Sequence, residues 1–167
     1  MTKKAKGTRR ARQSSSSSPT SIDLGHLPEL VGYALRQAQL AIFRDFVRAF
    51  ARFDIRPVQY GILAVIERNP GLKQQHVCQA IGIRRANFVS LLDELEHRGL
   101  ARRGPSAHDQ RASALYLTES GKALMRKLRK ANSVHETRIA AGLSPAKRRL
   151  LIEMLNTIKS CADASGE

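Results

Sequence analysis

Four polar side chains that lie close together in the sequence have the chemistry needed to recognise DNA. They are Arg84, Arg85, Asn87 and Ser90. The amide of Asn87 suits adenine, an arginine can bond to guanine or to phosphate, and a serine can bond to either. Attraction to phosphate alone would explain the arginines equally well, and Asn87 and Ser90 could simply be solvated. These side chains are therefore candidates for reading a duplex.

The surrounding residues predict the helix that would present these side chains. Apolar residues at intervals of three and four predict a helix from about Arg84 to His97 whose N-terminal end is polar and exposed. Its buried face would consist of Phe88, Leu91, Leu92 and Leu95. A shorter helix, Lys73 to Ile81, precedes it, and Gly82 supplies the turn. This is a helix-turn-helix pattern, in which the second helix enters the major groove.

A basic hairpin is expected after the second helix. Leu100 to Arg103 and Arg111 to Leu117 have the pattern of two short strands, joined by a polar loop, Gly104 to Gln110. The hairpin carries positive or polar side chains that can reach a duplex, namely Arg102, Arg103 and His108. We expect a two-stranded wing beside the helix-turn-helix.

These elements resemble the MarR family of bacterial transcription regulators. The resemblance rests on Arg98-Gly99-Leu100, on the pair Asp109-x-Arg111 and on Leu117-Thr118, and it extends over about Leu27 to Ile158. It implies a mainly α fold with a two-stranded β-wing. It also implies that Arg111 either enters the minor groove or pairs with Asp109. The candidate DNA-binding residues are Lys73, Gln74, Gln75, Arg84, Arg85, Asn87, Ser90, Arg102, Arg103, His108, Asp109 and Arg111.

The chain departs from the family pattern at the start of both DNA-facing helices. Lys73 and Arg84 stand where members commonly have Ser, Thr or Asp. A cation there opposes the helix dipole and gives up a capping bond, at a cost of about 1 kcal/mol each. We hypothesise that DNA phosphate supplies the missing counter-charge.

Long apolar helices are expected on either side of a DNA-binding lobe at about 57–117. One covers about 27–53, a second starts at Thr118, and the last starts with Ser144 as its cap. The first is apolar over more than half its circumference, which a lone small domain would not need, so we expect the three helices to pair with those of a second subunit in a homodimer. Packing within one chain is the alternative. A twofold dimer would present two reading helices about 34 Å apart and would require an inverted-repeat operator.

Charge and composition narrow the class of partner. The 167 residues carry 29 Lys and Arg against 14 Asp and Glu, a net charge of +15, which favours a polyanion as partner.

We divide the chain into a basic, Ser-rich tail at 1–26 and one domain at 27–164. The tail is expected to be disordered or to add phosphate contacts. The domain contains dimerisation helices at about 27–53 and 118–164. No apolar run approaches the roughly 20 residues of a membrane span. We expect a cytoplasmic, nucleoid-associated bacterial protein.

A small-molecule effector is suggested by one cation within an aromatic and aliphatic line. Arg36 lies at helical spacing from Tyr33 and Phe43, and Tyr60 begins the next helix. Such a set suits an aromatic acid or its CoA thioester, and residues 35–46 look like the family branch tied to aromatic-acid degradation and hydroxycinnamoyl-CoA sensing. Arg36 could instead extend from the apolar face so that its charged end reaches water, or it could pair with Asp45 or Glu29.

Other classes of function have little support in the sequence. There is no P-loop, no Gly-x-Gly-x-x-Gly and no nucleophile elbow, so we expect no enzyme and no cofactor. The five histidines form no metal-binding motif. Two alternatives stay open. One is an architectural DNA-binding protein without an effector, and the other is a thiol redox sensor that uses Cys78 or Cys161.

Overall fold

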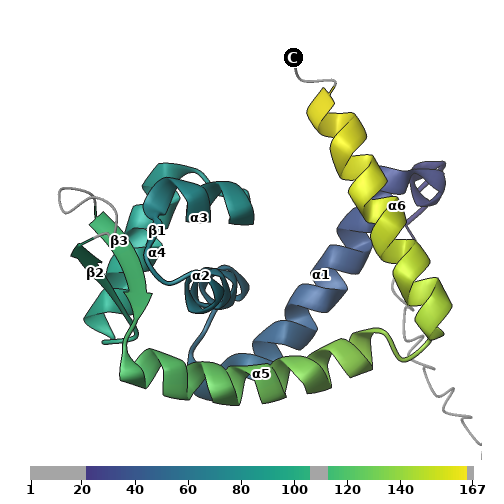
Figure 1. Ribbon diagram of the computed structural model, residues 1–167. Helices are drawn as coiled ribbons and strands as arrows, with labels where there is room; N and C mark the ends of the chain where they lie inside the picture. Colours follow the sequence, from purple (N-terminus) through teal and green to yellow (C-terminus); the bar gives the residue numbers. More distant parts are fainter. Residues whose placement is uncertain (1–21, 106–112, 165–167) are drawn as a thin grey trace, which may run out of the picture. The chain divides into compact units, whose positions relative to one another are not determined.

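The computed structural model describes residues 22–105 and 113–164 and is mainly helical, with one small antiparallel sheet (Figure 1). The chain divides into two units, Met1–Arg36 and Gln37–Glu167, which we describe separately. The order of elements is η1 (Leu27–Glu29), α1 (Val31–Phe50), η2 (Ala51–Phe53), α2 (Pro57–Arg68), β1 (Leu72–Lys73), α3 (Gln74–Ile81), α4 (Arg85–His97), β2 (Ala101–Pro105), β3 (Ser113–Leu117), α5 (Glu119–Ile139) and α6 (Pro145–Ala164). The mainly α winged helix-turn-helix class is confirmed.

The first long helix is shorter at both ends than the sequence predicted. A separate turn of 3₁₀ helix, η1, precedes it, and Leu30 between them is extended, with φ −82° and ψ 128°. At the other end, α1 is followed by the 3₁₀ helix η2, and Asp54 after η2 takes a left-handed conformation with φ 50°. Apolar periodicity continues through both breaks, and therefore it did not reveal them.

The helix-turn-helix matches its prediction closely. α3 ends at Gly82, whose φ of 71° is in the left-handed region that favours glycine, and the Gly82 N–H donates to the Cys78 carbonyl at 2.9 Å. α4 begins after Arg84, which is extended. α3 starts one residue later than expected because Lys73 is paired with Ala114 in the sheet.

The sheet has three strands rather than the two that were predicted. Its order is β1-β3-β2, with β1 pairing Leu72 with Leu115 and β2 pairing Arg103 with the same residue on the other side. β1 has only two residues, which is too short for an alternating pattern to show. Sequence periodicity therefore missed it, although the fold class is unaffected.

One apolar core joins the C-terminal end of α1 to α2, α3, α4, the sheet and α5. Its fully buried side chains include Phe50, Ile62, Leu63, Ile66, Val77, Phe88, Leu92, Leu95, Leu115, Met125 and Leu128. Burial of each such side chain contributes about 1.5–3 kcal/mol. The core therefore fixes the rotation of α4, because the residues it buries lie on one face of that helix.

The start of α5 is locked to the base of the wing. Thr118 caps the helix, since its Oγ1 accepts from the Gly121 N–H at 3.0 Å. The same hydroxyl donates to the Gly99 carbonyl at 2.5 Å. A Cβ on Gly121 would lie 2.0 Å from the Leu100 carbonyl oxygen, so only glycine allows this close approach.

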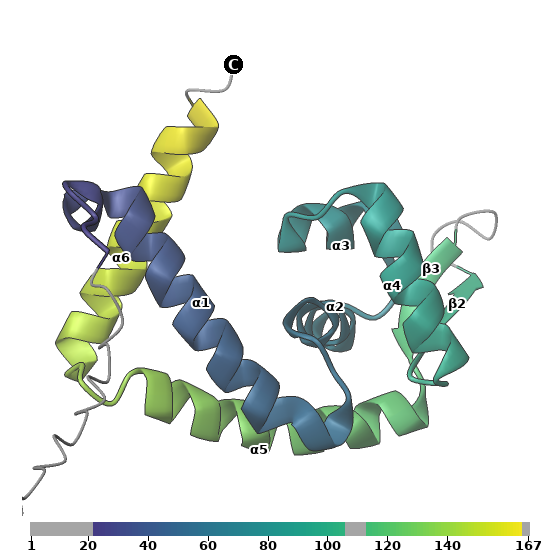
Figure 2. The same ribbon diagram turned by 180° about the vertical axis from the view of Figure 1, so that it is seen from behind.

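The C-terminal half of α1 meets α5 (Figure 2), and the buried carboxylate of Asp45 connects the two helices. Asp45 accepts from Arg138 Nε at 2.8 Å and from His135 Nδ1 at 2.7 Å, and a further hydrogen bond comes from Arg48 at 3.3 Å. Asp45 and His135 are both buried. Hydrogen bonds from Arg138 and then from His135 lower the pKa of Asp45 from 3.8 to about 2.

We expect Asp45→Asn to be destabilising at neutral pH, because it removes the charge that Arg138 and His135 satisfy. A lowered folded-state pKa gives stability that is present above the unfolded pKa of 3.8 and is lost as the pH falls toward 2. The difference in thermal midpoint between wild type and variant should therefore shrink between pH 4 and pH 2. Asp163→Asn, on exposed α6, is the control. A difference that stayed constant over this range would contradict the role of Asp45.

Candidate nucleic-acid interface

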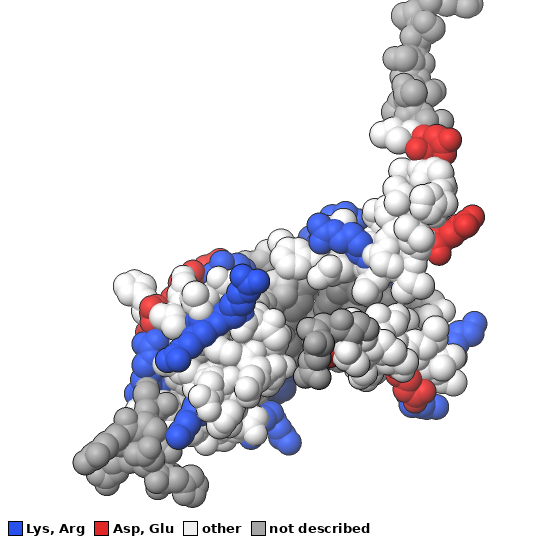
Figure 3. Space-filling view, turned by 90° about the horizontal axis from the view of Figure 1, so that it is seen from above, with Lys and Arg blue, Asp and Glu red and all other residues white. Residues whose placement is uncertain are grey.

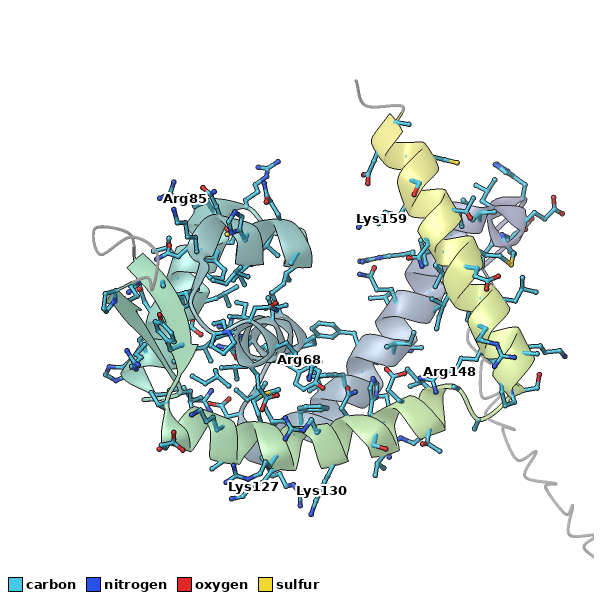
Figure 4. All side chains as sticks on the ribbon, viewed as in Figure 1. Arg68, Arg85, Lys127, Lys130, Arg148 and Lys159 are labelled. Atoms are coloured by element: carbon cyan, nitrogen blue, oxygen red, sulfur yellow. The ribbon has the colours of Figure 1, made fainter. Side chains whose placement is uncertain are left out.

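The N-terminal end of α4 presents the four side chains that the sequence singled out. Arg84, Arg85, Asn87 and Ser90 are all exposed, whereas Phe88 between them is completely buried. Figure 4 places Arg85 on the outside of the lobe, pointing away from the core. The core therefore turns this end of the helix outward, as a recognition helix requires.

The starts of α3 and α4 have unsatisfied donors that favour an anion. Their N-cap residues, Lys73 and Arg84, make no capping hydrogen bond in the described part of the chain, and neither first turn contains an acidic residue. The free N–H groups and the helix dipole make each end attractive to phosphate. Gln74 is half-buried, and Gln75 is exposed beside His76.

The two arginines of β2 have different surroundings. Arg102 lies over the ring of Tyr116, 4.7 Å from its centroid, and the Tyr116 hydroxyl donates to the Pro105 carbonyl at 2.8 Å. Arg103 bonds to Asp93 at 2.8 Å and also to Glu96, and these carboxylates raise its pKa. Arg103 thus braces the wing against α4. His108, Asp109 and Arg111 lie outside the described residues.

Acidic residues on the C-terminal half of α4 were not singled out from the sequence. Glu94 accepts from Gln59 at 2.8 Å and pairs with Arg56 of the segment that enters α2. Glu94 thus connects α4 to α2, whereas Asp93 and Glu96 connect α4 to β2 through Arg103. The available signal was three carboxylates within about one turn of the helix, but spacing alone cannot name the partner.

Seen from above, Lys and Arg side chains form a band across the lobe that contains α3, α4 and the sheet (Figure 3). Acidic side chains lie along one edge of the band in this view. Because a duplex carries its negative charge along its outside, such a face attracts it without regard to sequence. The exposed end of α4 adds groups that can reach base edges.

The four candidate effector residues fall in different units. Tyr33 and Arg36 belong to the first, and Phe43 and Tyr60 to the second. Phe43 is exposed. Tyr60 is half-buried, with its ring 5.5 Å from that of Phe50, and burial raises its pKa. Asp45, suggested as a structural partner for Arg36, is instead engaged by His135, Arg138 and Arg48.

Other types of site find no support in the described residues. Burial raises the pKa of the Cys78 thiol, which opposes the thiolate that redox sensing requires. Within 22–105 and 113–164, no three His, Cys, Asp or Glu side chains gather as a metal site would need. None of the described helices combines the length and hydropathy needed to cross a bilayer.

Known proteins with the same arrangement are transcription regulators. Residues 53–112 match the model of the MarR family. A transcriptional regulatory protein for the hcr operon of Thauera aromatica is 33% identical over 135 residues, which is 80% of this chain and 81% of that protein. Among solved structures, the transcriptional repressor CouR bound to a 23-mer DNA duplex is 39% identical, with a TM-score of 0.78, covering 84% of this chain and 99% of that one.

A second structure of CouR, bound to p-coumaroyl-CoA, is 39% identical with a TM-score of 0.76, covering 83% of this chain and 97% of that one. The structural similarity and the sequence identity point to the same family. The chain therefore belongs to the MarR family of winged helix-turn-helix transcription regulators and is not an enzyme.

Proposed function

We propose that this protein is a homodimeric repressor that binds an inverted-repeat operator and releases it when an aromatic acyl-CoA thioester binds. The observation that carries the proposal is the 39% identity to a repressor solved both with a DNA duplex and with p-coumaroyl-CoA. The cationic end of α4 and the exposed apolar helices support the DNA-binding and dimer components, respectively.

The apolar side chains of α6 support a dimer. None of its described residues is buried in the single chain. Large apolar side chains are exposed along it, namely Leu150, Leu151, Ile152, Met154, Leu155 and Ile158. An apolar surface of this extent on a soluble protein marks an interface. A twofold partner of the same sequence would cover it and would set the separation of the two reading helices.

We expect Leu155→Asp to convert the dimer into a monomer of 18.5 kDa at micromolar concentration, because a carboxylate would be buried without a partner. Analytical ultracentrifugation measures the mass directly. Ser160→Asp introduces the same charge on the same helix and should leave the dimer intact if the apolar stripe is the interface. A wild-type protein that sediments as a monomer would refute the dimer.

Base reading is assigned to Arg85, Asn87 and Ser90, and phosphate binding to Lys73 and Arg84 with the free N–H groups of their helices. Gln74, Gln75 and Arg102 flank this face and would add polar contacts. We assign Arg103 to bracing the wing, since two carboxylates already hold it. From the family resemblance, Arg111 would enter the minor groove, with Asp109 and His108 beside it.

We expect Arg85→Ala to weaken operator binding by a factor of about 10 to 100, which corresponds to roughly 1–3 kcal/mol. Fluorescence anisotropy on a selected duplex, at several salt concentrations, gives both the affinity and its salt slope. A base contact leaves the slope unchanged, whereas a phosphate contact lowers it by about 1. Lys130→Ala, on the outer side of α5, controls for the lost charge (Figure 4). Equal losses in both variants would refute a specific role for Arg85.

The effector is assigned by similarity and by residue chemistry. Tyr33, Phe43 and Tyr60 can supply aromatic contacts to an aryl group, and Arg36 can neutralise an anion. Ligand that binds the DNA-free dimer more tightly than the DNA-bound form would shift the population toward release.

We expect p-coumaroyl-CoA to raise the thermal midpoint, because a ligand at 100 times its dissociation constant stabilises the folded state by about 2.7 kcal/mol. p-Coumarate and CoA, each alone, are the controls and should have smaller effects. Phe43→Ala should reduce the shift caused by the thioester. If neither thioesters nor free aromatic acids shifted the thermal midpoint, the proposed effector would be refuted. In a separate binding assay, equal affinity for selected and random DNA would favour the architectural alternative.

A further inference from the structure

A basic cavity lies where the end of α4, η2 and α5 meet, and the operator-binding face does not account for it. Its volume is about 690 Å³, within the range of roughly 300–1,000 Å³ typical of small-molecule sites. Phe53, Leu100 and Leu124 form its apolar lining. The remaining lining residues are all cations: Arg52, Arg98, Lys127 and Lys130.

The positive charge of this cavity is poorly neutralised within the described residues. Arg98 donates to the main-chain carbonyls of Asp54 at 2.5 Å and Phe53 at 2.9 Å, and both acceptors are neutral. The nearest carboxylate, that of Asp54, is 3.9 Å away with its side chain 99% exposed. Water screens so exposed a carboxylate, so it offsets little of the charge. Arg98 is thus held in place while its charge remains available.

The other three cations have no carboxylate partner in the described part of the chain. Arg52 lies over the Phe53 ring, 4.6 Å from its centroid. Neither Lys127 nor Lys130 forms an ion pair there, whereas nearby Lys122 and Arg129 pair with Glu119 and Glu67. Four cations around one hollow repel one another, and a multiply charged anion would relieve that repulsion.

This cavity faces away from the end of α4 that is proposed to read DNA. Figure 4 places Lys127 and Lys130 on the outer side of α5, on the opposite side of the lobe from Arg85. A duplex held against Arg85 would therefore not neutralise these lysines. Their charge needs a different ligand, one small enough to enter a cavity of this volume.

We propose that this cavity binds a nucleoside diphosphate or a larger molecule that contains one. Two adjacent phosphates match a rim of four cations, with the planar guanidinium of Arg98 suited to bidentate contact. The apolar surface of Phe53, Leu100 and Leu124 suits the flat base. Such a ligand would bridge the end of α4 to α5 and thereby stiffen the lobe.

Isothermal titration of the full-length protein with ADP at low salt tests the site. We expect saturable binding that weakens at least tenfold in the double variant Lys127→Ala/Lys130→Ala. The matched control is Lys147→Ala/Lys159→Ala, which removes the same charge from α6 and should bind ADP as wild type does. Both pairs of lysines are exposed, so neither variant should disturb the core.

Three results of the titrations would overturn the proposal. They are no saturable ADP binding, an equal loss in both double variants, and inorganic pyrophosphate binding as tightly as ADP, which would leave no role for the base. Weaker operator binding by the Lys127/Lys130 variant without ADP would also overturn it, because the cavity would then contact DNA.

The nucleotide could be free or part of a CoA thioester, and titration with p-coumaroyl-CoA separates these sources. A matching loss of thioester affinity in the Lys127/Lys130 variant identifies the nucleotide end of CoA, and an unchanged affinity identifies a free nucleotide. The ADP titration does not depend on the proposed effector, so the two proposals can fail independently.

Discussion

The attachment of α1 to α5 through Asp45 is the interaction on which the other parts depend. A carboxylate buried beside Phe46 must be fully satisfied, and Arg138 and His135 satisfy it from the far end of α5. α5 also starts at the base of the wing. A displacement at one end of this helix is therefore transmitted to its other end. Helices that join two subunits can set the position of a recognition helix only if this attachment is rigid.

Charge is distributed unevenly along α4, and each half has a separate task. The cations Arg84 and Arg85 at its N-terminal end oppose the helix dipole, as do Asp93 and Glu96 toward its C-terminal end. Arg103 compensates the acidic half within the chain. Only the cationic half is left without a partner in the described residues, and in our proposal the phosphates of a duplex provide it.

Much of this fold could be predicted from the sequence because its strongest signals are periodic. The spacing of Phe88 and Leu92 predicted the buried face of α4, and Gly82 predicted the turn between α3 and α4. The two-residue strand β1 was missed because two residues are too few to show an alternating pattern. The bracing of Arg103 by Asp93 was missed because ion pairs between elements depend on tertiary geometry. Arg36 and Tyr60 illustrate a third limit, since spacing along the chain cannot show whether residues of different units meet.

In our proposal, two cationic reading helices are held one duplex turn apart. Selection of bound duplexes from a random library, followed by sequencing, measures this spacing. We expect an enriched inverted repeat whose half-sites are centred about 10 base pairs apart, or a multiple of that spacing. Enrichment of a single half-site, of a direct repeat or of no sequence at all would contradict it.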